Sequence, residues 1–185
     1  RLGGRPAGEI QLRFLRDRGG RAVGPFTASE FAAACLGPGG PGERVVSGEH
    51  VLPTSLHGRG DEETKFAVED RRWHRTGDAG YLDAHGRLWL LGRCGARIQD
   101  AGGTLYPFKV ECAAHHHPGV RRAAVVALGG RRVLAIEREP GADCSGLESA
   151  LAWAHIDAIQ FLKKIPVDKR HNAKVDYPAL RKLLD

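Results

Sequence analysis

A tight turn followed by a hairpin is the feature that most constrains the fold of this chain. The turn is Thr76-Gly77-Asp78: glycine tolerates positive φ, and Thr and Asp side chains bond to nearby backbone amides. Residues 80–83 and 87–91 have the composition of two strands, and Asp83-Ala84-His85-Gly86 between them is typical of a hairpin loop. The pattern predicts that the start and the end of this hairpin meet at one edge of a sheet.

Two charged residues stand at that predicted edge. Asp78 is the last residue of the turn, and Arg93 follows the second predicted strand. A carboxylate and a guanidinium held together suit a vicinal diol such as that of ribose, because the carboxylate accepts the hydroxyl protons and the guanidinium donates. Considered alone, the pair has an alternative interpretation, an exposed ion pair that contributes about 0–1 kcal/mol.

Further motifs follow in a fixed order. Ile98-Gln99-Asp100-Ala101-Gly102-Gly103 leads to Leu105-Tyr106-Pro107-Phe108-Lys109-Val110-Glu111, and Val167-Asp168-Lys169-Arg170-His171-Asn172-Ala173-Lys174 stands near the end. With the turn and Arg93, this series resembles the core motifs of the adenylate-forming (ANL) superfamily of acyl-CoA synthetases, luciferases and peptide-synthetase adenylation domains. The resemblance covers roughly residues 42–185 and implies the C-terminal portion of an AMP-dependent acyl-CoA synthetase or ligase.

The resemblance implies roles for individual residues. Asp78 and Arg93 would hold the ribose of ATP, and Gly102 and Gly103 would enter the site beside the pantetheine arm during acyl transfer. Lys174 would contact the carboxylate and the α-phosphate during adenylation. That chemistry brings two anions together, so an ammonium group there neutralises charge that develops in the transition state. Standing alone, Lys174 would be interpreted as part of a solvated basic loop.

Three positions depart from the pattern of the family. Gly95 occupies the hinge position, where an acid or lysine is common, although an ordinary turn glycine is the alternative interpretation. Gln99 stands where lysine is frequent, and Ala173 replaces the glycine that usually precedes the catalytic lysine. The segment that ends at Lys174 is similar to that of the olefin-pathway β-lactone synthetases, which adenylate β-hydroxy acids and close the ring without coenzyme A.

The fold class that we expect is α+β. Residues 1–94 are expected to form the β-rich tail of a large adenylation domain, and residues 95–185 a small mobile domain of antiparallel sheet with helices on one face. In the second part we expect an antiparallel pair of strands with polar residues outward. The expected elements are strands at 9–16, 123–128, 133–137 and 156–165 and helices after Thr27, from Pro107 to Glu111, at 147–154 and after Pro178.

Two family motifs are absent from these 185 residues. There is no Ser/Thr/Gly-rich phosphate loop followed by Pro-Lys, and no aromatic-Gly-x-Thr-Glu segment. The Mg²⁺ ligand, the triphosphate clamp and the acyl pocket are therefore expected outside this sequence, as part of a missing N-terminal adenylation domain. A chain that starts Arg-Leu-Gly-Gly and contains no Met is interpreted as a fragment, and we expect it not to adenylate an acid alone.

Composition excludes several other classes of protein. The net charge of +6 comes from arginines scattered among glycines, without the interleaved aromatic residues that stack bases, so no nucleic-acid partner is expected. A basic surface attracts polyanions such as ATP and coenzyme A. No apolar run approaches the ~20 residues of a membrane span, and no signal sequence opens the chain. The four cysteines follow no disulfide framework, so we expect reduced thiols and a cytoplasmic location.

His115-His116-His117 with Cys112 contains residue types that bind metal ions. Consecutive histidines at a helix end point in different directions, whereas zinc needs four convergent ligands, so no metal ligand is predicted here. His50 and His57 are interpreted as loop histidines.

Three functions remain open from the sequence. The first is part of an ATP- and Mg²⁺-dependent ligase that converts a carboxylic acid, expected to be a fatty or other apolar acid, to an acyl-adenylate and then to a thioester, with coenzyme A as one acceptor. The second is a β-lactone synthetase, and the third is a non-catalytic domain that binds a nucleotide or a carrier protein.

Overall fold

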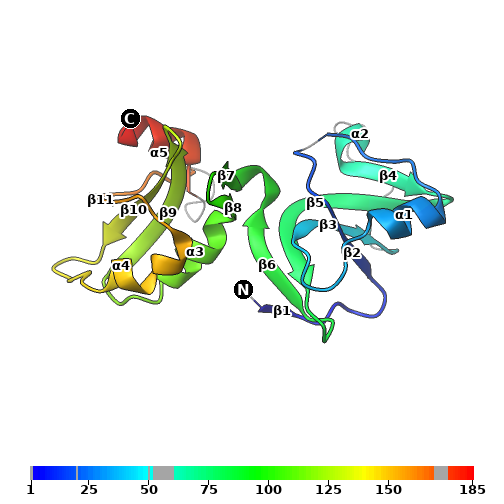
Figure 1. Ribbon diagram of the computed structural model, residues 1–185, viewed down its shortest axis with the longest axis horizontal. Coiled ribbons are helices and arrows are strands. Elements are labelled where there is room, and N and C mark those ends of the chain that lie inside the picture. Colours follow the sequence, from blue (N-terminus) through cyan, green and yellow to red (C-terminus); the bar gives the residue numbers. More distant parts are fainter. Residues whose placement is uncertain (1, 20, 50, 52–60, 169–174) are drawn as a thin grey trace. The chain divides into compact units, whose positions relative to one another are not determined.

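The computed structural model of the protein describes residues 2–19, 21–49, 51, 61–168 and 175–185. The chain forms two compact units, Arg1–Ala96 and Arg97–Asp185. Figure 1 shows that strands dominate the first unit and that helices and strands mix in the second. The α+β class expected from the sequence is confirmed.

The first unit is built on an antiparallel sheet with the strand order β1-β6-β5-β3-β2, and β4 pairs with β5 outside this path. The predicted strand at residues 9–16 is confirmed as β2, in which Leu12, Phe14 and the last residue, Leu15, are buried while Gln11 and Arg13 are exposed. The strands are β1 (Leu2–Gly4), β2 (Gln11–Leu15), β3 (Gly42–Ser47), β4 (Lys65–Val68), β5 (Arg71–Leu82) and β6 (Leu88–Arg93).

Helix α1 (Ala28–Ala34) begins at the predicted capping box. The hydroxyl of Thr27 accepts the backbone N–H of Glu30, and the Glu30 carboxylate accepts the backbone N–H of Thr27 at 2.8 Å. Phe31 then packs its ring 4.6 Å from that of Trp73 and 5.9 Å from that of Phe66, measured between ring centroids. A local cap thus starts the helix, and an aromatic cluster fixes it to the sheet. A second helix, α2 (Asp61–Thr64), precedes β4.

The predicted hairpin between β5 and β6 is confirmed. Asp83 organises its loop by accepting hydrogen bonds from the Arg87 backbone N–H at 2.9 Å, the Arg87 Nε at 2.7 Å and the Trp89 Nε1 at 2.9 Å. The Trp89 bond, followed by those of the loop, holds the pKa of the Asp83 carboxyl well below its usual range. The hairpin register sets Asp78 opposite Arg93.

The second unit has a sheet with the order β11-β10-β9 and a separate two-stranded pair, β7 with β8. Strands β9 and β10 are antiparallel, as predicted, and β11 joins the sheet parallel to β10, a pairing that the sequence did not predict. The elements are β7 (Ile98–Asp100), β8 (Gly103–Leu105), α3 (Pro107–Ala114), β9 (Val120–Leu128), β10 (Arg131–Arg138), α4 (Leu147–Ala150), β11 (Ala158–Leu162) and α5 (Tyr177–Leu184).

Strand β10 is buried on both faces, which corrects two expectations. Leu134 and Ile136 face a core that includes residues of α3 and α4, while Val133 and Ala135 face a second core that includes α5. Helices therefore cover both faces of this sheet, and the polar-outward pattern expected for the pair was wrong. A strand buried on both sides has a nearly continuous apolar sequence, which alternation cannot divide into faces.

The helix predicted at residues 147–154 is interrupted. Helix α4 ends at Ala150, and a 3-10 turn, η3 (Ala152–Ala154), follows before His155 adopts a left-handed conformation with φ of 49°. The strand chosen for 156–165 is confirmed as β11, and the helices expected from Pro107 and near Pro178 are confirmed as α3 and α5.

A partly buried carboxylate joins α3 to the sheet and to α5. Oε1 of Glu111 accepts the backbone N–H of Val125 at 3.1 Å and the hydroxyl of Tyr177 at 2.7 Å. Burial raises the pKa of Glu111, against the opposing effect of these hydrogen bonds. The Glu111 carboxylate therefore connects α3 to α5, and its burial disfavours the charged form.

Glu111→Gln is expected to change how stability depends on pH. A carboxyl whose pKa is raised by folding stabilises fully below its ordinary pKa of 4.5, and this contribution is lost as the pH rises through the folded pKa. The variant lacks this titration, so its free energy of unfolding relative to wild type should improve as the pH rises from about 4.5. Urea unfolding across the pH range measures this. Parallel curves for the variant, the wild type and the exposed control Glu148→Gln would contradict it.

No helix in the described part of the chain has the length and apolar character needed to cross a membrane.

Candidate functional site

The structure brings Asp78 and Arg93 together at the edge of the first unit. They are Cα partners on β5 and β6, and Arg93 Nη1 lies 3.1 Å from Asp78 Oδ1. The same nitrogen donates to the Thr76 carbonyl at 3.1 Å, across a turn in which Gly77 has φ of 68°. The sheet thus positions the acid, and a positive-φ glycine turns the chain ahead of it.

A third charged residue, Arg44 on β3, belongs to this edge and was missed from the sequence. Its Nη2 lies 2.6 Å from Asp78 Oδ2, and its Nε lies 3.3 Å from the Thr76 hydroxyl, which donates to the Arg44 carbonyl at 3.0 Å. Only the pairing of β3 with β5 reveals this neighbour, because the two strands are far apart in sequence. Asp78 therefore lies between two guanidinium groups.

The exposure of these three side chains leaves room for a ligand. The exposed fractions are 24% for Asp78, 23% for Arg44 and 65% for Arg93. A carboxylate offers about four acceptor sites, so two arginine contacts do not saturate it. The arrangement presents one anchored carboxylate with remaining acceptor capacity beside a solvent-accessible donor, which fits a pair of vicinal hydroxyls.

A buried ion pair fixes the strands beneath this edge. Arg75 on β5 donates from Nη2 and Nε to Glu43 Oε2 on β3 at 2.6 and 3.0 Å, with exposed fractions of 4% and 7%. Cys94, buried nearby, has a thiol pKa raised to about 12, first by burial and then by the charge of Glu43. Cys94 is thus a protonated thiol and not a nucleophile. Glu43 and Arg75 directly precede Arg44 and Thr76 in the sequence, so the ion pair also fixes the positions of these two residues.

Gly102 and Gly103 lie where β7 turns into β8 in the second unit: Ala101 and Gly102 make the turn, and Gly103 is the first residue of β8. Gly103 has φ of 93°, and the Gly102 backbone N–H donates to Asp100 Oδ1 at 2.8 Å. A Cβ added at Gly102 would lie 3.1 Å from Arg132 Nη2 and 3.2 Å from Asp100 Oδ1. The turn is therefore an exposed glycine pair packed directly against an ion pair.

Of the remaining two predicted site residues, the structure describes Gly95 but not Lys174. Gly95 lies in the 3-10 turn η2 (Cys94–Ala96), where a Cβ would meet nothing within 4 Å, and the boundary between the two units follows Ala96. Lys174 lies outside the described residues, as do His50 and His57. On either side of its segment, Val167 bridges to Val175.

The histidines considered for a metal have other partners. Nδ1 of His116 lies 2.7 Å from the Cys112 carbonyl oxygen, and Nε2 of His117 lies 3.0 Å from the Ser145 carbonyl oxygen. Within the ranges that the structure describes, no group of three or more His, Cys, Asp or Glu side chains is arranged to hold a metal ion.

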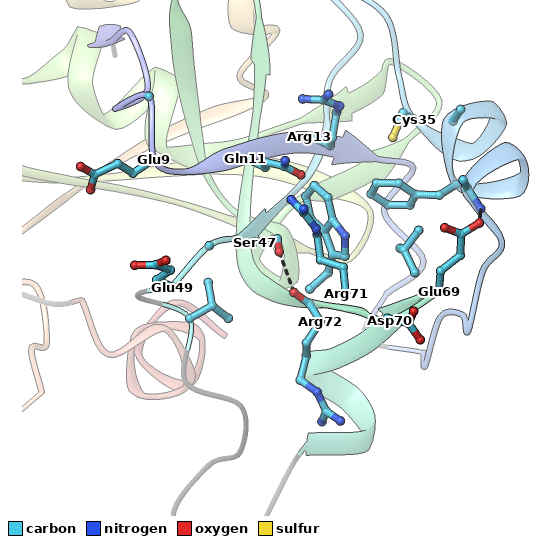
Figure 2. A pocket seen from close by; sticks show the side chains of 18 residues that line it. Glu9, Gln11, Arg13, Cys35, Ser47, Glu49, Glu69, Asp70, Arg71 and Arg72 are labelled. Carbon is cyan, nitrogen blue, oxygen red and sulfur yellow. Dashed lines mark hydrogen bonds between the residues drawn. The ribbon is translucent and has the colours of Figure 1, made fainter.

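A hollow of about 1270 Å³ lies elsewhere in the first unit (Figure 2), between β2, the end of β3, α1 and the β4–β5 turn. Its lining mixes Arg13 and Arg72 with Glu49 and Glu69, so opposite charges offset each other. None of Asp78, Arg93 or Arg44 lines it. The hollow is thus separate from the charged edge.

Comparison with known proteins gives consistent relatives, although no protein-family model matches the chain. It is 44% identical over 121 residues to an olefin beta-lactone synthetase of Xanthomonas campestris, covering 57% of this chain. It is 36% identical over 163 residues to an olefin beta-lactone synthetase of Stenotrophomonas maltophilia, covering 77% of this chain. It is 33% identical over 125 residues to a 2-succinylbenzoate–CoA ligase of Bacillus cereus, covering 68% of this chain. The chain spans 22%, 29% and 22% of the length of these relatives, respectively.

Solved structures share the fold over the whole chain. The amide bond synthetase McbA from Marinactinospora thermotolerans matches with a TM-score of 0.75 and 24% identity, over 100% of this chain and 36% of its own. The O-succinylbenzoate coenzyme A synthetase MenE from Bacillus subtilis, in complex with AMP, matches with a TM-score of 0.73 and 22% identity, over 100% of this chain and 35% of its own.

Proposed function

We propose that this chain, which belongs to the adenylate-forming (ANL) superfamily, is part of an ATP-dependent carboxylic acid ligase. It matches the C-terminal portion of the members of that superfamily. The complete enzyme would form an acyl-adenylate and then an acyl thioester. Residues 1–94 would belong to the large adenylation domain, and residues 95–185 would be the small mobile domain.

The observation that carries the proposal is the edge formed by Asp78 and Arg93. Asp78 would accept the hydroxyl protons of the ribose of ATP, while Arg93, which is 65% exposed, would donate to the same diol. Arg44 contacts the other oxygen of the carboxylate at 2.6 Å and so helps to orient it. The AMP complex of MenE supports a nucleotide as the ligand of this fold.

Lys174 would supply the charge that the first chemical step needs. Attack of a carboxylate on the α-phosphate brings two anions together, and an ammonium ion on a flexible stem lowers the repulsion. Gly95 would serve as the hinge, since a residue with no Cβ and no neighbour within 4 Å of that position can change its backbone angles at low cost. Gly102 and Gly103 would lie beside the pantetheine arm of coenzyme A during transfer.

Lys174→Ala in the complete enzyme should lower the rate of acyl-adenylate formation by about 100- to 1000-fold, the usual cost of removing one transition-state charge contact. The KM for ATP should change little, because the ribose contacts remain. ATP–pyrophosphate exchange measures both quantities, with the exposed Lys164→Ala as control. Wild-type exchange by Lys174→Ala would reject the catalytic role. Nucleotide binding without any exchange by the wild type would favour the non-catalytic alternative.

Several parts of the activity would come from outside these residues. The Mg²⁺ ligand, the triphosphate clamp and the acyl pocket correspond to motifs that this sequence does not contain. The chain alone is therefore expected to be inactive in the same exchange assay. We expect a cytoplasmic enzyme of fatty acid metabolism, with coenzyme A as the thiol acceptor.

A β-lactone synthetase is the second candidate, and two observations favour it. Relatives that are 44% and 36% identical are named olefin beta-lactone synthetases. The segment ending in Asn172-Ala173-Lys174 is also similar to that branch. Both candidates share the adenylation step and differ in the acceptor, which is an external thiol in one and the substrate's own β-hydroxyl in the other.

The product formed from a β-hydroxy acid separates the two candidates. The complete enzyme would be incubated with ATP, Mg²⁺ and a long-chain β-hydroxy acid, with and without coenzyme A, and the products identified by mass spectrometry. A neutral lactone formed without the thiol rejects the thioester ligase. An acyl thioester that forms only with coenzyme A, with no lactone, rejects the β-lactone synthetase.

A further inference from the structure

We propose that Arg132 is a positioning residue for the step that consumes the acyl-adenylate, because its guanidinium sets the shape of the Gly102-Gly103 turn. The inference rests on the proposed function, in which this turn enters the site during the second half-reaction. It adds a residue on β10, outside the motifs that the sequence analysis identified.

The guanidinium of Arg132 forms hydrogen bonds with two residues at the turn, Asp100 and Gly103. Nε of Arg132 donates to Asp100 Oδ2 at 2.6 Å, and Nη2 donates to Asp100 Oδ1 at 2.6 Å, which is a bidentate arrangement. Nη2 also reaches the Gly103 carbonyl oxygen at 3.3 Å. Asp100, the last residue of β7, and Gly103, the first residue of β8, are thereby bound to one side chain.

The guanidinium is itself held firmly. The Arg132 side chain is only 5% exposed, and its Nη1 donates to the Ala154 carbonyl at 2.9 Å. The backbone of Arg132 exchanges two hydrogen bonds with Asp157, through the Asp157 carboxylate at 2.6 Å and the Asp157 backbone N–H at 2.9 Å. Arg132 therefore connects an exposed turn to β10, the central strand of the sheet.

Asp100 links Arg132 to the glycines of the turn through a hydrogen bond. Its Oδ1 accepts the Gly102 backbone N–H at 2.8 Å, so the same carboxylate contacts Arg132 and the turn. The hydrogen bonds from Arg132 hold the pKa of Asp100 below its usual range, so the carboxylate stays charged near neutral pH. A Cβ at Gly102 would lie 3.1 Å from Arg132 Nη2, so a side chain at this position would press on the ion pair.

The strands of the hairpin have a separate source of stability. Ile98 on β7 and Leu105 on β8 are buried in the core of the second unit, whereas Gly102 and Gly103 are exposed. Removing the guanidinium should thus alter the turn more than the strands. The Asp78–Arg93 edge belongs to the other unit, and the hydrogen bonds of the Arg132 side chain go to Asp100, Gly103 and Ala154, not to the Val167–Val175 bridge that flanks the segment of Lys174, so adenylation should be preserved.

The test compares the two half-reactions in the complete enzyme under single-turnover conditions. Pyrophosphate release reports adenylate formation, and the disappearance of the bound adenylate reports its transfer to the thiol or to the internal hydroxyl. The variants are Arg132→Met, the conservative Arg132→Lys, and Asp100→Asn, which keeps an acceptor oxygen but removes the charge. Arg131→Met, an exposed neighbour on the same strand, is the matched control, and thermal unfolding is followed for all of them.

Arg132→Met and Asp100→Asn should form the adenylate at a rate within about twofold of wild type but consume it about 10- to 100-fold more slowly, as expected when a reacting group is misplaced by a fraction of an ångström to 1 Å. Arg132→Lys should recover part of that rate, and Arg131→Met should match wild type. Equal losses in both half-reactions, or an unchanged second step in Asp100→Asn and Arg132→Met, would overturn the inference. A wild-type enzyme that forms no adenylate would instead reject the proposed function, and the inference with it.

Discussion

The pairing of β5 with β3 on one side and β6 on the other is the constraint on which the candidate site depends. It sets Asp78 opposite Arg93 and brings Arg44 to 2.6 Å from the same carboxylate. A shift of one residue in either pair would turn these side chains to the other face. The buried Glu43–Arg75 pair and the Asp83 loop oppose such a shift, since each fixes one of the two registers.

Charged groups in the second unit connect two helices and a turn to the sheet. Glu111 ties α3 to the start of α5, and Arg132 ties the Gly102-Gly103 turn to β10. Both act from elements whose apolar residues are already buried, so the polar contacts direct segments at the surface and do not create the core. This division would suit the small mobile domain that we propose, which would present different loops to the site in different steps.

The sequence predicted the features that depend on local chemistry. The capping box at Thr27, the Asp83 hairpin and the helix start at Pro107 follow from residues within a few positions of one another, and the structure has all three. The meeting of Asp78 with Arg93 follows from the hairpin itself.

Features that depend on long-range pairing could not be predicted in this way. Arg44 is 34 residues from Asp78, and Arg132 is 32 residues from Asp100, so only the tertiary structure reveals either contact. The parallel addition of β11 and the burial of both faces of β10 likewise depend on which elements pack on the sheet. A continuous apolar run such as Val133 to Ile136 does not record that choice.

The central claim is that the Asp78 carboxylate binds the hydroxyls of a ribose. Its most direct test is the kcat/KM for ATP, 2′-deoxy-ATP and 3′-deoxy-ATP, measured for the complete wild-type enzyme and for Asp78→Ala. A hydrogen bond to a charged group contributes about 1.5–3 kcal/mol, so the wild type should prefer ATP over the deoxynucleotides by roughly 10- to 100-fold, and the variant should lose that preference. An unchanged preference for ATP in Asp78→Ala would contradict the account.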